Sequence, residues 1–293
     1  PDFHHLPAHI KNEITDGAYL LALARVPGRP QDEVRDLLQY YRLVGRAAVP
    51  GLCELLPNLN DRSLHKDSCD TLLTVSGDEI LSIVENLNLD NPNEAKDVVY
   101  LIRQSGIGGI PPVIKRLVSC PDVQVREYVI EYLVHVADDE AAQLLSGQLD
   151  DGVEDIRVKT LAAVEDFKHP LMLDKVMRIC FADDNTTKST VERERMYRTV
   201  GKLAGQKALA PIEQMIKKKG WLPFGKTRDR NEKLFAISAL RIIPGEEAAR
   251  MLTSLSKDSD SLVRNKALYA LKQLPRNEAD DEPQTVVASM EAE

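Results

Sequence analysis

One stretch near the carboxyl end decides the fold: residues 258 to 274 read DSDSLVRNKALYALKQL. Four apolar side chains that follow Arg264 fall on one stripe of an α-helix, at Ala267, Ala270, Leu271 and Leu274. The alanines on this stripe would let a neighbouring helix approach closely. A strand would need alternation with a period of two, which the stretch lacks. The stretch therefore predicts an amphipathic helix that packs against other helices.

The same pattern recurs about every thirty residues. A basic residue heads each apolar-periodic segment, at Arg35, Lys66, Lys96, Arg126, Arg157, Arg193, Lys233 and Arg264. A second apolar-periodic segment follows within each repeat, so each unit reads as a pair of helices. One pair cannot bury its apolar face alone, but stacked neighbours can cover it. We therefore predict an all-α fold, an α-solenoid of about seven to eight helix pairs.

Residues with special roles at helix ends support this division. Aspartates that precede the first helix of a pair can accept hydrogen bonds from free backbone amides, and they are Asp32, Asp61, Asp122, Asp155 and Asp260. Glycines that suit a left-handed C-terminal cap are Gly45, Gly77, Gly106, Gly205 and Gly245. We expect three regions: an N-terminal cap segment at 1–30, the repeats at 31–275 and a disordered tail at 276–293. The tail has six acids and one base.

The repeat resembles the short bacterial HEAT-like repeats, of the type found in phycobilisome (PBS) lyases. Their pattern Asp-x-Asp-x-x-Val-Arg-x-x-Ala-x-x-Ala-Leu stands in full from Asp258 to Leu271. The resemblance extends over about residues 32 to 275 and is weakest at Leu64 to Leu87, where His65 and Lys66 replace Val-Arg. It implies a superhelical, armadillo-like stack of helix pairs, a type of fold that serves mostly in protein binding.

Composition and charge exclude several classes of protein. A chain of 293 residues with 43% hydrophobic side chains can bury a sizeable core. The formal net charge of -8 argues against a protein that mainly neutralises nucleic-acid phosphates. The apolar stretch from Ala18 to Ala24 is far shorter than the roughly 20 residues of a membrane helix. We expect no membrane partner.

The cysteines and histidines give no recognisable metal motif. Cys53, Cys69, Cys120 and Cys180 form no C-x-x-C pair. Cys53, Cys69 and Cys180 fall among helical apolar residues and read as small apolar side chains, and a reducing cytoplasm fits best. His4, His5 and His9 crowd the start of the chain, where nothing fixes a tetrahedral site. His65, His135 and His169 read as solitary. We therefore expect no metal and no cofactor.

Signatures of catalysis are also missing from the sequence. There is no Gly-x-Ser-x-Gly elbow, and Gly106-Ile-Gly108-Gly109 lacks the Lys-Ser/Thr that completes a phosphate-binding loop. We expect that the protein is not an enzyme.

One segment combines basic and aromatic residues. Residues 217 to 233 hold seven bases and two acids, with the single Trp of the chain. Such a segment can hold an anion, with a ring as a stacking face. The candidate partner- or anion-binding residues are Lys217, Lys218, Lys219, Trp221, Phe224, Lys226, Arg228 and Arg230. In the alternative interpretation, the two rings plug a gap between helix pairs and the lysines extend into solvent.

Three functions stay open at this point. The first is a non-catalytic scaffold or adaptor that binds another protein or a peptide. The second is a module that binds an anion, a nucleotide or nucleic acid through the basic segment 217–233. The third is an enzyme, since a few HEAT-like families, such as bilin lyases and alkyl-base glycosylases, perform chemistry.

Overall fold

The computed structural model describes residues 16, 19, 22, 30–59, 61–165, 167, 169–182, 187–217 and 225–274, with Asn58 and residues 225–229 described by their backbone alone. These residues form α-helices and short 3-10 helices, and none of them lies in a strand. The predicted all-α class is confirmed for this part of the chain. Contacts divide the chain into two compact units, Pro1–Leu145 and Ser146–Glu293.

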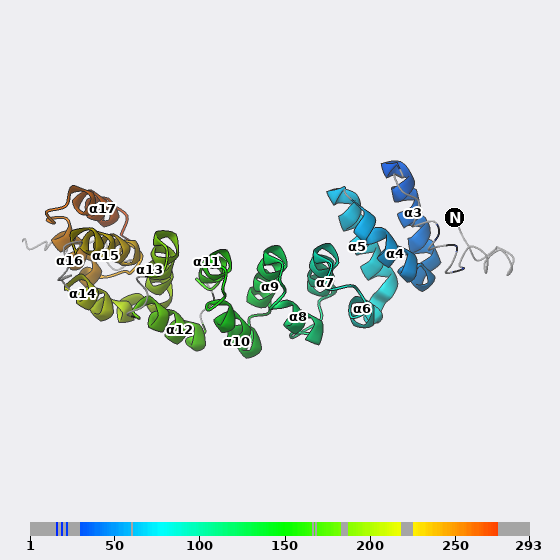
Figure 1. Cartoon of the computed structure of the whole chain (residues 1–293), viewed down its shortest axis with the longest axis horizontal. Helices are drawn as coiled ribbons and strands as arrows, with labels where there is room; N and C mark the ends of the chain where they lie inside the picture. The colour runs from blue at the N-terminus through cyan, green and yellow to red at the C-terminus, as the bar shows by residue number, and fades with distance from the viewer. Residues whose placement is uncertain are drawn as a thin grey trace, which may run out of the picture. The chain divides into compact units, whose positions relative to one another are not determined.

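Unit 1 is built from two rows of helices. The first row holds α3 (Gln31–Val44), α5 (Arg62–Ser76), α7 (Pro92–Ser105) and α9 (Val123–Val136), each of which contacts the next (Figure 1). The second row holds α4 (Val49–Leu55), α6 (Ile80–Val84) and α8 (Pro112–Leu117), which pack on α5, α7 and α9 respectively. The 3-10 helices η2 (Gly45–Ala48), η3 (Leu56–Asn58) and η4 (Gly77–Glu79) connect them.

Unit 2 repeats this arrangement. Its first row holds α11 (Glu154–Ala163), α13 (Thr190–Ala204), α15 (Gly225–Leu240) and α17 (Ser261–Lys272), again with contact between successive members. Its second row holds α12 (Pro170–Cys180), α14 (Leu209–Lys217) and α16 (Glu246–Leu255), and η6 (Gly205–Ala208) leads into α14. The helix α10 (Asp139–Gln148) contains the boundary between the two units.

The apolar stripe forms the core, as predicted. In α9 the residues three, six and seven positions after Arg126 are Val129, Tyr132 and Leu133, and all three are buried. The corresponding stripes of α15 and α17 bury Ala236, Ala239, Leu240, Ala267 and Ala270. No described helix has the length and hydrophobicity that a bilayer crossing requires.

Most predicted helix starts are confirmed, but two are wrong. Asp61, Asp122 and Asp260 cap α5, α9 and α17, and each side chain accepts one or two hydrogen bonds from backbone amides of the first turn. Asp32 instead lies inside the first turn of α3 after Pro30, and Asp155 lies inside α11 after Val153. In both helices the residue before the first turn has an extended backbone and no capping side chain, and the carboxylates lie where they interact favourably with the helix dipole.

Four predicted glycines end a helix as expected, but only Gly106 has the left-handed αL conformation. Gly45, Gly77, Gly106 and Gly205 directly follow α3, α5, α7 and α13 and have positive φ angles. Gly245 is different: α15 ends at Leu240, and Gly245 is the residue before α16. Its φ of 113° therefore serves the entry into a helix, where a residue without a side chain avoids strain.

The basic residues that head the repeats connect each repeat to its surroundings. Within their own repeats, Arg126 donates to the carbonyl oxygens of Cys120 and Pro121, and Arg264 donates to those of Asp258 and Ser259. Others reach the next repeat. In unit 2 these pairs are Arg157 with Glu192, Arg193 with Glu232 and Lys233 with Asp258. In these repeats the base therefore bonds to the loop before its helix, to the neighbouring repeat or, at Arg157, to both.

Candidate functional site

A groove in unit 1 is lined by basic, acidic, aromatic and sulfur-containing side chains. It encloses about 700 Å³ and is lined by residues of α5, α7 and α9, together with Leu56, Pro57 and Leu59. The first-row helices contact one another in sequence, so the groove runs across three consecutive repeats.

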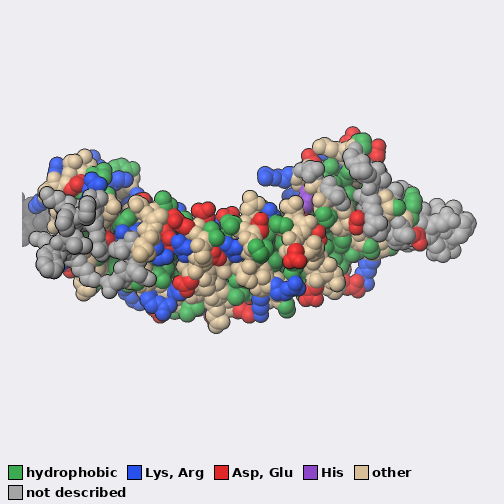
Figure 2. Space-filling model, in the orientation of Figure 1, with side chains coloured by type: hydrophobic (Ala, Val, Ile, Leu, Met, Phe, Trp, Pro, Cys, Tyr) green, Lys and Arg blue, Asp and Glu red, His purple; other side chains and the backbone are tan. Residues whose placement is uncertain are grey.

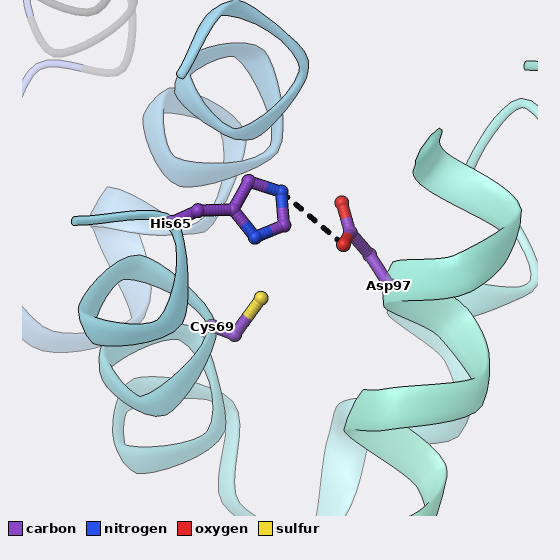
Figure 3. A group of neighbouring side chains, drawn as sticks. All are labelled: His65, Cys69 and Asp97. Atoms are coloured by element: carbon purple, nitrogen blue, oxygen red, sulfur yellow. Dashed lines mark ion pairs between the residues drawn. The ribbon is translucent and has the colours of Figure 1, made fainter. Parts of the chain in front are cut away.

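Three side chains converge within the groove. His65 and Cys69 lie one turn apart on α5 and so share a helix face, while Asp97 projects from α7 toward them (Figure 3). Nε2 of His65 lies 3.2 Å from Oδ1 of Asp97. One donor atom each from His65, Cys69 and Asp97 can be chosen such that all three lie within 4.8 Å of one another.

These three groups are shielded from water to different degrees. Cys69 and Asp97 are buried, with 1% and 4% of their surface exposed, whereas His65 is half-buried. Oδ2 of Asp97 is buried and has no hydrogen-bond partner among the described residues. Leaving a buried carboxylate oxygen without a donor is unfavourable by about 1–3 kcal/mol or more.

The surroundings shift the pKa values of two of these groups. The hydrogen bond to Asp97 raises the pKa of His65, against the opposing effect of burial, and the negative charge of Asp97 adds to the increase. Burial raises the pKa of the Cys69 thiol far above its usual range, and the carboxylates of Asp97 and Asp70 raise it further. His65 and Asp97 therefore form a hydrogen-bonded pair beside the buried Cys69 thiol.

Basic and aromatic residues line the open part of the groove. Arg62 and Lys66 of α5 are exposed and form no ion pair among the described residues, and Nζ of Lys96 donates to Oε1 of Gln124 at 2.7 Å. Figure 2 shows Lys and Arg side chains beside a histidine near α5. Tyr128 of α9 is 47% exposed. These side chains give the groove a positive wall and an aromatic face.

Tyr100 completes the lining next to Cys69. Its hydroxyl group donates to Oδ1 of Asp70 at 3.0 Å. Burial together with this hydrogen bond raises the pKa of Tyr100 to about 12, so the phenol stays protonated at neutral pH. Tyr100 is therefore a fixed, neutral wall of the groove.

The basic segment predicted at 217–233 is described in part. Lys218, Lys219, Trp221 and Phe224 lie outside the described residues, and the side chains of Lys226 and Arg228 in α15 do as well. Lys217 is exposed at the end of α14 and pairs with Glu213 at 2.6 Å. The anion-binding role of these residues, and the alternative in which the two rings pack inward, stay predictions.

The described end of that segment has structural contacts. Nη1 of Arg230 lies 4.0 Å from Oδ2 of Asp260, and Nζ of Lys233 lies 2.9 Å from Oδ2 of Asp258. Both carboxylates belong to the turn that precedes α17. At this end of the segment, Arg230 and Lys233 therefore attach α15 to the last described repeat.

The sequence pattern did not reveal the cluster in unit 1. His65 was expected to be solitary, and this is wrong because Asp97 of the next repeat hydrogen-bonds to it. Two signals were present. His65 and Cys69 are four residues apart on one helix, and His65 stands where the repeat pattern has Val. The position of Asp97 gave no such signal, because it depends on how α7 is placed against α5.

Comparison with known proteins gives no relative for this site: no protein-family model matches the chain, and no curated protein matches it. The residues and their geometry therefore carry the functional interpretation.

Proposed function

We propose that the chain is an α-solenoid of about seven to eight HEAT-like helix pairs and that it acts as a non-catalytic scaffold for a partner protein. Ion pairs between successive repeats support the solenoid, because Arg157, Arg193 and Lys233 each connect their repeat with the next. The free thiols of all four cysteines agree with a reducing compartment such as the cytoplasm.

The groove of unit 1 is the proposed binding surface, and an acidic segment of the partner is its proposed occupant. One observation carries this proposal: Arg62 and Lys66 of α5 and Lys96 of α7 line one groove of about 700 Å³ together with an exposed Tyr128. The carboxylate of Asp97 is buried and paired with His65, whereas Arg62 and Lys66 are exposed to a partner. Charge complementarity of this kind directs binding to a segment rich in Asp and Glu.

The size of the groove also fits a peptide segment. The groove crosses α5, α7 and α9, and its apolar end at Leu56, Pro57 and Leu59 can bury one large side chain of the partner. Tyr128 offers a ring that binds without losing much conformational freedom. An acidic segment that contains one apolar or aromatic residue therefore matches both ends of the groove.

Selection from a displayed library of random peptides tests this proposal. The full chain should enrich peptides that combine Asp or Glu with an apolar residue. For an enriched peptide, the double variant Lys66→Glu/Lys96→Glu should weaken binding by about tenfold or more, which corresponds to about 1.4 kcal/mol. Fluorescence anisotropy measures the change in dissociation constant.

A matched control uses two exposed bases of the same unit that do not line the groove, Arg103 of α7 and Arg116 of α8. Arg103→Glu/Arg116→Glu introduces the same change of net charge and should leave the dissociation constant within about twofold. Enrichment of basic peptides, or equal loss in both double variants, would refute binding of an acidic segment in this groove.

A further inference from the structure

We propose that His65, Cys69 and Asp97 form a zinc-binding site. The geometry points to it because an imidazole nitrogen, a sulfur and a carboxylate oxygen lie within 4.8 Å of one another. Figure 3 shows the three side chains turned toward a common point between α5 and α7. This site is independent of whether the groove binds a partner protein.

The unpartnered oxygen of Asp97 is a second and separate observation. Oδ1 accepts from His65, but Oδ2 is buried and accepts no hydrogen bond among the described residues. A bound cation would satisfy this oxygen, which the protein otherwise keeps away from water without compensation. The Asp97 carboxylate is therefore positioned to bind a metal ion.

The donor set selects the metal. Thiolate and imidazole ligands favour zinc, while Mg²⁺ and Ca²⁺ require oxygen ligands. The basic side chains Arg62, Lys66 and Lys96 line the same groove and disfavour an ion that is held by charge alone. Bonds from sulfur and nitrogen to zinc depend less on the surrounding charge.

Charge and protons balance when zinc binds. The ligands bind zinc as a thiolate, a neutral imidazole and a carboxylate, and the protons that they give up go to solvent. Zn²⁺ then faces one thiolate and one carboxylate, so the occupied cluster carries no net charge, which is compatible with its burial. Three protein ligands leave a fourth position for water from the groove.

A nucleophilic Cys-His-Asp triad is the competing interpretation, and the geometry argues against it. In such a triad the imidazole lies between the nucleophile and the carboxylate. One ring nitrogen hydrogen-bonds to the nucleophile and the other to the carboxylate. Here the sulfur and the carboxylate oxygen also lie within 4.8 Å of each other. Cys69 is 1% exposed, so its sulfur is poorly placed to attack a substrate.

Cobalt substitution in the full chain tests the proposal. After treatment with a chelator, the protein is titrated with Co²⁺ and then with Zn²⁺. We expect one equivalent of Co²⁺ to give the thiolate-to-cobalt charge-transfer absorption and the strong visible bands of tetrahedral cobalt, which Zn²⁺ then removes. Cys69→Ser should abolish the charge-transfer band, and Asp97→Asn should weaken binding by about 100-fold.

Two controls separate this site from other sources of metal binding. Cys120→Ser changes another buried cysteine of unit 1 and should retain the full cobalt spectrum. The variant His4→Ala/His5→Ala/His9→Ala removes the histidines at the start of the chain and should also retain it. Metal bound by those histidines alone gives no thiolate band.

A further measurement in the unchanged protein covers the case in which a variant fails to fold. Because Cys69 is buried, a reagent reaches it only when the site opens locally, and bound Zn²⁺ opposes this opening. One equivalent of Zn²⁺ should therefore slow the alkylation of Cys69 by at least about tenfold, as read by mass spectrometry, while Cys53 reacts at its former rate. The proposal is overturned if no thiolate-to-cobalt band appears, if Cys69→Ser retains the band, or if Zn²⁺ leaves the alkylation of Cys69 unchanged.

Discussion

The guanidinium group of Arg157 in α11 forms two parallel hydrogen bonds with the carboxylate of Glu192 in α13. Nε lies 2.8 Å from Oε1, and Nη2 lies 2.6 Å from Oε2. Glu192 is almost completely buried, with 2% of its side chain exposed. The same guanidinium donates to the carbonyl oxygen of Asp151, so one side chain joins a loop and two repeats.

Loss of this pair should destabilise unit 2. Arg157→Ala leaves the buried carboxylate of Glu192 with Lys188 as its remaining charged partner, and we expect a loss of about 3 kcal/mol in the free energy of unfolding. Urea denaturation followed by circular dichroism measures it. Arg250→Ala is the control, because its pair with Glu247 is exposed and long, at 3.9 Å. Equal effects of the two substitutions would contradict the importance of the buried pair.

Two buried glutamates should make unit 2 sensitive to acid. Burial raises the pKa of Glu165 and of Glu192, but hydrogen bonds from Lys202 and Arg195 to Glu165, and from Arg157 and Lys188 to Glu192, outweigh burial and lower both pKa values. A carboxyl group whose pKa is lower in the folded state adds stability above its unfolded pKa. That stability disappears as the pH falls through the folded pKa.

The melting temperature should therefore fall steeply below about pH 4.5, the ordinary pKa of glutamate. The double variant Glu165→Gln/Glu192→Gln should be less stable at pH 7 and should show a shallower decline on acidification. Differential scanning fluorimetry from neutral to acidic pH measures both curves. Parallel curves for the two proteins would show that these carboxylates do not cause the acid sensitivity.

Because α13 and α15 approach closely, substitution of Gly201 should destabilise the protein. A Cβ atom added to Gly201 would lie 2.8 Å from the backbone oxygen of Ala239, a distance that requires the helices to move apart. We expect Gly201→Ala to lower the free energy of unfolding by about 1–3 kcal/mol, although alanine is the better helix former.

Gly147→Ala in α10 is the matched substitution, because nothing lies within 4 Å of the added atom. It should leave stability unchanged or raise it by up to about 1 kcal/mol. Thermal unfolding of the two variants compares them directly. A neutral Gly201→Ala would mean that α13 and α15 can separate without loss.

Helix caps should depend on the observed geometry and not on the sequence pattern alone. Asp260 accepts hydrogen bonds from the amides of Leu262 and Val263, so Asp260→Ala should cost about 1 kcal/mol. Asp32 lies within the first turn of α3 and caps no amide there, so Asp32→Ala should cost less than about 0.5 kcal/mol. Chemical denaturation measures both, and a larger loss at Asp32 would reverse the assignment.

Much of the local structure was predictable. The apolar stripe behind Arg126 predicted the buried residues of α9, and Asp61, Asp122 and Asp260 marked helix starts correctly. Asp32 and Asp155 failed as caps because an aspartate in the first turn and one just before it look alike in sequence. The cluster in the groove was missed for a different reason, since its members come from two repeats.

The sequence by itself determined which segments are helical and which face of each helix is apolar, because periodicity and capping act within a few residues of one another. The tertiary structure alone decided what meets across repeats. Asp97 faces His65 and Cys69 because α7 packs on α5 in one particular register, and Gly201 faces Ala239 for the same kind of reason. The offset and rotation between packed helices follow from the fit of many side chains, which no single repeat contains.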